Sequence, residues 1–183
     1  MKTDHVVILK EVVAAPERDM NSDDKGSIYL VFEYLEHDLA GLMDLRYDTM
    51  FRMESIKCFM KQLLEGLYAL HHNKIIHRDI KASNLLVNNE GILKIADFGL
   101  ARPHLDEPWQ YTANVVTLWY RPPEVLLATE AKRSTVVYST YVDMWSAGCI
   151  LAEMLFRAPL FKGKTETELI ECIYKVLGTP TVS

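Results

Sequence analysis

A run of charged and polar residues interrupts the apolar middle of the chain and constrains its fold more than any other feature. The run is His77-Arg78-Asp79-Ile80-Lys81-Ala82-Ser83-Asn84, and Asp97-Phe98-Gly99 begins 13 positions after Asn84. Between them, two short apolar segments at 85–87 and 93–96 flank four turn-forming residues, which predicts a two-stranded ribbon. Such a ribbon folds the chain back, so that Asp97 is expected to lie beside Asn84.

The rest of the chain divides into strand-like segments followed by helical ones. Residues 6–13 and 28–32 are apolar and rich in β-branched side chains, which predicts two strands, and their closeness in sequence favours an antiparallel pair. Apolar residues recur at three- and four-residue steps over 53–71 and predict an amphipathic helix there. Residues 142–156 are apolar nearly all round, which is typical of a central buried helix.

Two further features complete the fold prediction. The segment 97–124 has little periodicity and contains four prolines, and a loop of this length inside a compact domain is usually functional. A capping box at 165–168 predicts the start of a last helix, which Gly178 ends. Strands, a strand pair and helices in this order predict the α+β class.

Composition excludes several classes of protein. The 183 residues include 20 Lys and Arg against 25 Asp and Glu, a net charge of −5, so no direct nucleic-acid partner is expected. No apolar run reaches the roughly 18 residues of a membrane span, so no membrane partner is expected either. The three cysteines lie far apart without a CxxC pair, which argues against a disulfide framework or a zinc site and favours a reducing compartment.

The polar run contains the residue types that phosphoryl transfer needs. Asp79 can accept or orient the proton of a substrate hydroxyl, and Lys81 beside it can neutralise charge on the moving phosphoryl group. The amide oxygen of Asn84 and the carboxylate of Asp97 are the oxygen ligands that Mg²⁺ prefers. No other pattern of His, Cys or carboxylates nearby indicates a second metal site.

The ordered set HRDxKxxN, DFG and PPE, carried here by residues 77–84, 97–99 and 122–124, resembles that of eukaryotic protein kinases. A lone Asp-Phe-Gly is usually only a turn, whereas the whole ordered set rarely arises in an unrelated fold. The resemblance runs from about residue 6 to residue 181, nearly the whole chain.

This resemblance implies a protein-kinase-like α+β fold in a single incomplete kinase domain over 1–183. Residues 1–35 would be the remnant of an N-lobe, with two strands and the hinge. Residues 36–183 would be most of the mainly helical C-lobe, through a helix that ends near residue 177.

Three stretches are similar to the cyclin-dependent kinases: residues 31–39 to their hinge, and residues 97–102 and 111–124 to the start and end of their activation segment. The sequences EYLEHDL, KCFMKQLLEGL and WYRPPE favour the transcription-associated branch, which phosphorylates the C-terminal repeats of RNA polymerase II. The cell-cycle branch is the alternative.

The resemblance implies a nucleotide site at the hinge. Phe32 would be the gatekeeper behind the adenine, the backbone of Glu33 and Leu35 would hydrogen-bond its edge, and Asp38 would lie near the ribose. Leu86 would form the apolar floor of the site. Core packing explains the apolar residues Phe32 and Leu86 equally well.

Other residues match positions that regulate kinases. Thr112 would be the activating phosphosite, with Arg78 and Arg102 as partners of its phosphate. Asp143 would brace the HRD turn from below, because a buried Asp without partners is costly. His77 is expected to pack and hydrogen-bond rather than to act as a base.

The end of the activation segment matches positions that recognise substrate. Thr117 would bridge Asp79 and Lys81. Val116 and Arg121 would shape a proline-directed pocket, in which the Val takes a strained positive φ and the Arg satisfies its carbonyl. A substrate with Pro after the target Ser or Thr has no N–H to meet that carbonyl.

These matches imply a proline-directed Ser/Thr kinase that uses ATP and Mg²⁺, with a cyclin as partner and Ser/Thr-Pro proteins as substrates. A nuclear and/or cytoplasmic location is expected, the nucleus by resemblance only. The sequence also departs from the family, because it contains no GxGxxG loop, no strand Lys ahead of the hinge and no cyclin-contacting helix with its Glu. The chain as given is therefore expected to be inactive alone.

Two alternatives stay open at this point. The chain is either a piece of an active kinase or a truncated, catalytically dead lobe that acts as a binding module. In addition, residues 128–141 are several positions longer than the family's Gly-centred link, which indicates either a surface-loop insertion or an error in the gene model.

Overall fold

The computed structural model describes residues 4–14, 27–45, 51–104, 110–112 and 116–180. Its helices are α1 (Leu39–Asp44), α2 (Met53–His72), α3 (Pro123–Glu130), α4 (Tyr141–Phe156) and α5 (Glu166–Leu177), with single 3₁₀ turns at Ala82–Asn84 and Leu118–Tyr120. Its strands are β1 (Leu9–Ala14), β2 (Ile28–Phe32), β3 (His37–Asp38), β4 (Ile75–Ile76), β5 (Leu85–Val87), β6 (Leu93–Ile95), β7 (Arg102–Pro103), β8 (Gln110–Thr112) and β9 (Thr135–Val137). The predicted α+β class is confirmed.

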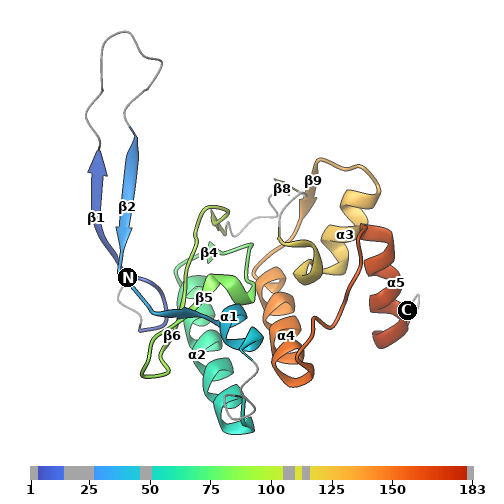
Figure 1. The fold of residues 1–183 in the computed structure, drawn as a ribbon. Coiled ribbons are helices and arrows are strands. Elements are labelled where there is room, and N and C mark those ends of the chain that lie inside the picture. The colour runs from blue at the N-terminus through green and yellow to red at the C-terminus, as the bar shows by residue number, and fades with distance from the viewer. Residues whose placement is uncertain (1–3, 15–26, 46–50, 105–109, 113–115, 181–183) are drawn as a thin grey trace.

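The first two strands form the antiparallel pair that the sequence predicts. β1 and β2 pair from Leu9 opposite Phe32 to Ala14 opposite Ile28, with an irregularity between Leu9 and Glu11. This hairpin projects away from the helices (Figure 1), and every residue in both strands is exposed. Its apolar side chains therefore add little to the core of the described structure.

The residues ahead of β1 leave the hairpin and follow a different strand. The predicted strand at 6–13 begins only at Leu9, because Val6 instead bridges Ile95 and the N–H of Val7 donates to the carbonyl of Ile95 at 3.0 Å. This segment crosses α2 at Gly66, where a β-carbon would lie 2.7 Å from the carbonyl oxygen of His5. Gly66 is thus required for close approach of the two backbones.

The predicted ribbon is confirmed at the centre of the molecule. β5 and β6 pair with Leu85 opposite Ile95 and Val87 opposite Leu93, and β3 adds on the other side of β5. The turn between them is closed by the side chain of Asn88, which accepts hydrogen bonds from the N–H groups of Glu90 and Ile92. The ribbon packs on α2 through its buried side chains.

Two long helices, α2 and α4, pack against each other in the core (Figure 1). The bounds of both agree with the prediction to within one residue. The buried stripe of α2 includes Leu63, Leu67 and Leu70, at three- and four-residue steps. α4 is buried on one side only, since Met144 and Leu155 on the other side are exposed, so the prediction of burial nearly all round was too strong.

The chain also contains elements that the sequence did not predict. α1 and α3 are short helices without a long periodic pattern, and β9 lies in the 128–141 segment and pairs with β8. The segment 97–124 is therefore not a plain loop, although its residues 105–109 and 113–115 lie outside the described ranges.

The last helix begins and ends as predicted. The side chain of Thr165 accepts the N–H of Glu168, which is one half of the predicted capping box. The carboxylate of Glu168 reaches back one residue further than expected, to the N–H of Lys164 at 2.7 Å. Gly178 ends the helix with a positive φ of 84°.

A buried carboxylate on α4 joins this helix to the polar run. Asp143 is 1% exposed, and its Oδ2 accepts hydrogen bonds from the N–H of His77 at 2.9 Å and from Nε2 of His71 at 2.8 Å. Its Oδ1 accepts the N–H of Arg78 at 2.8 Å. Asp143 thus holds the turn at residues 77–78 from below, which is the contact expected from the sequence.

Asp143→Asn should destabilise the chain by about 3 kcal/mol, because an amide cannot accept all three hydrogen bonds and leaves buried N–H groups unsatisfied. Glu171→Gln on the exposed face of α5 is the matched control and should change the free energy of unfolding by less than about 0.5 kcal/mol. Urea titration of both variants measures the difference, and equal midpoints would contradict the bracing role.

Candidate functional site

The polar run and the end of the activation segment meet at the carboxylate of Asp79. Its Oδ2 accepts hydrogen bonds from Nζ of Lys81 at 2.7 Å and from Nδ2 of Asn84 at 3.1 Å. Its Oδ1 accepts the hydroxyl of Thr117 at 2.9 Å and the N–H of the same residue at 3.2 Å. The structure therefore brings together Asp79, Lys81, Asn84 and Thr117, four residues singled out in the sequence.

The role expected for Thr117 as a bridge needs correction. Thr117 and Lys81 contact different oxygens of the Asp79 carboxylate, and no hydrogen bond joins the two side chains within the described part of the chain. The carboxylate of Asp79 is therefore the bridge, and Thr117 is one of its donors.

These donors keep Asp79 ionised. Burial opposes its ionisation, but hydrogen bonds from Lys81 and Thr117 outweigh this effect and lower the pKa of Asp79 below its ordinary value. At neutral pH the site thus presents an anionic oxygen pair fixed by a cation, an amide and a hydroxyl.

The backbone connects Asn84, a neighbour of this carboxylate, to the segment that carries Asp97. The N–H of Ala96 donates to the carbonyl of Asn84 at 2.9 Å, which ties the residue before Asp97 to the end of the polar run. Because Nδ2 of Asn84 donates to Asp79, its amide oxygen is turned away from that carboxylate, and no residue in the described ranges donates to it. Asp97 is exposed and has a φ of 61°, and its Oδ1 accepts the N–H of Gly99.

The side chain of His77 is buried between the polar run and the segment at Ala96 and Phe98. Its Nε2 lies 2.9 Å from the carbonyl oxygen of Ala96, and its Nδ1 accepts the N–H of Asp79 at 3.3 Å. Its ring packs edge-on against the ring of Phe98, with the two ring centroids 5.1 Å apart. One neutral tautomer satisfies both hydrogen bonds. Burial lowers the pKa of His77 despite nearby carboxylates, which keeps the ring neutral.

The hinge contains an ion pair that the sequence did not predict. Both carboxylate oxygens of Glu33 accept hydrogen bonds from Nζ of Lys94 on β6, at 2.8 and 2.9 Å. The N–H of Glu33 donates to the carbonyl of Ile8 at 3.0 Å, so only its carbonyl is available to a ligand such as an adenine. Burial of Glu33 works against ionisation, yet the contacts with Lys94 and Ile8 lower its pKa.

The remaining hinge residues lie along the central sheet or in the hairpin. Asp38 on β3 lies opposite Leu86 on β5, so the predicted ribose and floor residues are neighbours. Oδ1 of Asp38 caps α1 by accepting the N–H of Gly41. Leu35 is buried, whereas Phe32 at the end of β2 is 41% exposed and does not occupy a closed core position.

The arginines predicted to bind a phosphate on Thr112 have other partners in this structure, which carries no phosphate there. Thr112 on β8 is exposed, while Arg78 is buried, with Nε donating to the carbonyl of Leu100 and Nη1 donating to the hydroxyl of Tyr138, both at 2.7 Å. Arg102 is exposed and donates to the carbonyl of Ala101. Burial raises the pKa of Tyr138 although Arg78 opposes this, so its hydroxyl stays protonated.

The geometry expected at the proline-directed pocket is present. Val116 has a φ of 65°, and its carbonyl accepts hydrogen bonds from Nη2 and Nε of Arg121 at 3.0 and 3.3 Å. Nη1 of Arg121 also contacts the carboxylate of Glu166 on α5, a partner that lies 45 residues away and that the sequence did not reveal. A strained valine persists here because a buried guanidinium holds its carbonyl.

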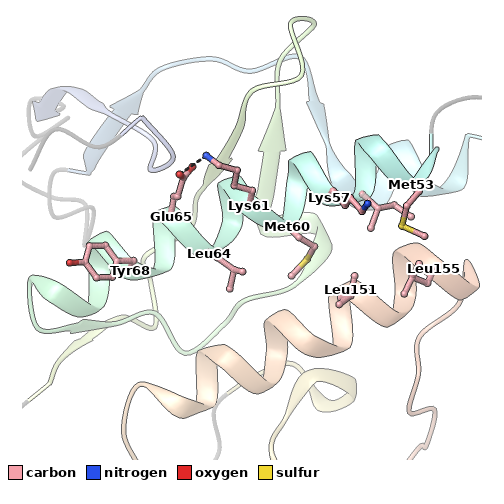
Figure 2. A pocket seen from close by; sticks show the side chains of 10 residues that line it. Met53, Lys57, Met60, Lys61, Leu64, Glu65, Tyr68, Leu151 and Leu155 are labelled. Atoms are coloured by element: carbon pink, nitrogen blue, oxygen red, sulfur yellow. Dashed lines mark hydrogen bonds and ion pairs between the residues drawn. The ribbon is translucent and has the colours of Figure 1, made fainter.

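A separate apolar groove of about 720 Å³ lies between α2 and α4 (Figure 2). Its lining includes Met60, Leu64, Leu151 and Leu155, and none of the site residues named above belongs to it. Among the described residues, no helix is both long and apolar enough to cross a bilayer.

Comparisons with known proteins show which family the chain belongs to. The family described as protein kinase domain matches residues 1–180. Cyclin-dependent kinase C-2 of Arabidopsis thaliana is 50% identical over 98% of this chain and 35% of its own length. Cyclin-dependent kinase G1 of the same plant is 51% identical over 96% of this chain and 26% of its own length.

A solved structure is also similar. A crystal structure of the yeast RNA Pol II CTD kinase CTDK-1 complex superposes with a TM-score of 0.82 and 44% identity, covering 99% of this chain and 54% of that one. The chain spans about a third or less of the length of these curated relatives.

The chain belongs to the protein kinase family, whose members use ATP and Mg²⁺. Within that family it is similar to cyclin-dependent kinases, as the sequence motifs predict, and the CTD kinase structure agrees with the transcription-associated branch.

The neutral state of His77 predicts a pH dependence of stability. Its pKa is lower in the folded chain than in the unfolded one, so the unfolded chain binds a proton first as the pH decreases. The stabilisation is complete above the unfolded pKa of about 6.5 and is lost as the pH falls towards the folded pKa.

We therefore expect the urea midpoint to fall between about pH 7.5 and about pH 5.5, and to fall less in His77→Gln, which keeps a donor and an acceptor but does not titrate. His72→Gln, at an exposed position on α2, is the control, and its urea midpoint should depend on pH as in the wild type. The same pH dependence in His77→Gln would contradict the assignment of this effect to His77.

Proposed function

We propose that this chain carries the catalytic loop and activation segment of a proline-directed Ser/Thr protein kinase of the cyclin-dependent type. The observation that carries the proposal is the Asp79 carboxylate, held by Lys81, Asn84 and Thr117, with the residue before Asp97 bonded to the carbonyl of Asn84. Each of these residues matches the family's motif, and the relatives at about 50% identity are cyclin-dependent kinases.

In this proposal Asp79 orients the hydroxyl of a substrate Ser or Thr and accepts its proton as the phosphoryl group is transferred. The lowered pKa of Asp79 suits a loose transition state, in which the hydroxyl loses its proton late and a strong base is not needed. Lys81, already 2.7 Å from Asp79, neutralises charge that develops near the carboxylate.

The oxygens of Asn84 and Asp97 fit Mg²⁺, because both are hard ligands and the hydrogen bonds of Asn84 to Asp79 turn its amide oxygen outward. When bound, ATP and Mg²⁺ supply the phosphoryl group and the charge that neutralises it. The nucleotide would be held at the hinge by the carbonyl of Glu33 and the backbone of Leu35, and by the side chains of Phe32, Asp38 and Leu86. The exposed carboxylate of Asp97 is accessible for this role.

The substrate class follows from Val116 and Arg121. Because Arg121 occupies the carbonyl of Val116, an incoming backbone N–H finds no acceptor there, and Pro is favoured after the target residue. The likeness to a CTD kinase supports RNA polymerase II repeats, which are rich in Ser-Pro, as substrates, with a cyclin as partner and a nuclear location.

A second candidate function is a binding module without turnover. The sequence of 1–183 contains neither a GxGxxG loop nor a strand Lys ahead of the hinge, and these groups position the nucleotide phosphates in kinases. The intact set of Asp79, Lys81, Asn84 and Asp97 favours the enzyme.

The two functions are separated by a chimaera in which residues 5–180 replace the matching segment of Arabidopsis Cyclin-dependent kinase C-2. With a cyclin, the chimaera should phosphorylate a Ser-Pro repeat peptide, and Asp79→Asn should reduce kcat by at least about a hundredfold. The 183-residue chain by itself should stay at background. A correctly folded chimaera without activity would favour the binding module.

The same chimaera tests the proline-directed pocket. Arg121→Gln frees the carbonyl of Val116 to accept a substrate N–H, so the ratio of kcat/KM for Ser-Pro over Ser-Ala peptides should fall about tenfold. Polymerase repeat peptides compared with histone-type peptides distinguish the transcriptional from the cell-cycle branch. An unchanged Ser-Pro preference in Arg121→Gln would show that the pocket is built differently.

A further inference from the structure

The segment between α3 and α4, which is longer than the usual kinase link, is not a free surface loop. Its strand β9 pairs with β8 of the activation segment, with Gln110 opposite Val137, Tyr111 opposite Val136 and Thr112 opposite Thr135. The hydroxyl of Thr135 also donates to Oε1 of Gln110 at 2.9 Å. The insertion therefore holds the strand that carries the predicted phosphosite.

Tyr138 follows β9 and extends this contact into the core. Its buried ring stacks on the ring of Tyr111 with centroids 4.9 Å apart. Its hydroxyl accepts a hydrogen bond from Nη1 of Arg78 at 2.7 Å and lies 3.3 Å from the carbonyl of Thr112, to which it donates. One side chain thus joins Arg78 of the polar run to the backbone of the phosphosite.

Arg78 has partners without a phosphate. Its side chain is 2% exposed, its Nε donates to the carbonyl of Leu100, and its guanidinium carbon lies 5.9 Å from the centroid of the Tyr111 ring. A buried guanidinium needs partners, and a phosphate on the activation segment is one way to supply them. Here Tyr138 supplies a neutral acceptor at the same cation.

We propose that β9 and Tyr138 form an internal clamp that orders the activation segment and engages Arg78 before Thr112 is phosphorylated. The clamp is a positioning device, because Tyr138 acts through Arg78 and β8 rather than on substrate. Further along the segment, Val116 already has its positive φ and Thr117 already binds Asp79, without a phosphate on Thr112.

The clamp has a consequence for regulation, which rests on the proposed kinase function. Thr112 is exposed and so accessible to a modifying kinase. A phosphate binds a guanidinium more strongly than a phenol does, so a phosphate on Thr112 would replace Tyr138 at Arg78. Phosphorylation of Thr112 should therefore raise the rate of turnover little when the clamp is intact and strongly when the clamp is broken.

Hydrogen–deuterium exchange of the 183-residue chain tests the clamp without any assay of activity. In Tyr138→Phe, which keeps the stacked ring and loses the hydroxyl, the amides of 110–112 and 135–137 should exchange about tenfold faster. Tyr141→Phe is the matched control, since this tyrosine is 76% exposed, and should leave exchange unchanged. Equal exchange in the two variants would overturn the proposal.

A second variant decides the question if Tyr138→Phe disturbs the whole fold, which loss of protection in α2 would reveal. Thr135 is exposed, and Thr135→Val keeps a β-branched side chain with high β-propensity while it removes the hydrogen bond to Gln110. It should accelerate exchange in β8 alone. Wild-type amides of 110–112 and 135–137 that exchange at unprotected rates would overturn the pairing itself.

The regulatory consequence is measured in the active chimaera. Unphosphorylated Tyr138→Phe should turn over a Ser-Pro peptide about tenfold more slowly than the unphosphorylated parent, and phosphorylation of Thr112 should restore its rate. A slower variant that phosphorylation does not rescue would show a merely structural role. An inactive parent chimaera would count against the proposed function, whereas the exchange result would still decide the clamp.

Discussion

The whole site depends on one buried carboxylate. Asp143 accepts hydrogen bonds from two backbone N–H groups and one imidazole, and it lies on α4, the helix that packs against α2. A carboxylate removed from water must have such donors, so the loop at His77 and Arg78 can lie in only one place relative to the two helices. The positive φ of 70° at Arg78 persists because both neighbouring N–H groups are fixed in this way.

The contacts of Asp143 also position the carboxylate of Asp79. Asp79 follows directly after the braced turn and gathers Lys81, Asn84 and Thr117. Hydrogen bonding outweighs burial there and holds its pKa low, whereas burial lowers the pKa of His77 and keeps that ring neutral. The site therefore has the anionic carboxylate of Asp79 beside the neutral imidazole of His77. This arrangement is suited to orienting a hydroxyl group rather than to strong base catalysis.

The activation segment is held from two directions. Arg121 fixes the strained Val116 next to Thr117, which binds the Asp79 carboxylate, and β9 with Tyr138 fixes β8. Both contacts use a buried arginine. Arg121 donates to the carbonyl of Val116 and contacts the carboxylate of Glu166, whereas Arg78 donates to the carbonyl of Leu100 and to the hydroxyl of Tyr138. The exposed β1–β2 hairpin, by contrast, adds a regular sheet but few buried contacts.

The sequence determined the parts of this protein that depend on local pattern. Three- and four-residue periodicity placed α2, the capping residues placed α5, and the turn after Val87 placed the ribbon that returns Asp97 to Asn84. Motif spacing identified the residues around Asp79 and also the contact of Asp143, because resemblance to a family carries its three-dimensional contacts. Short helices such as α1 and α3 were missed, since they are too short to show a period.

Only the tertiary structure decided which distant side chains meet. Lys94 pairs with Glu33 across 61 residues, Tyr138 reaches Arg78 across 60, and Glu166 meets Arg121 across 45. Each pair depends on where two backbones come together in space, and no local pattern of residues encodes that distance. For the same reason the sequence identified residues 128–141 as unusual in length but did not reveal that they form a strand against the activation segment.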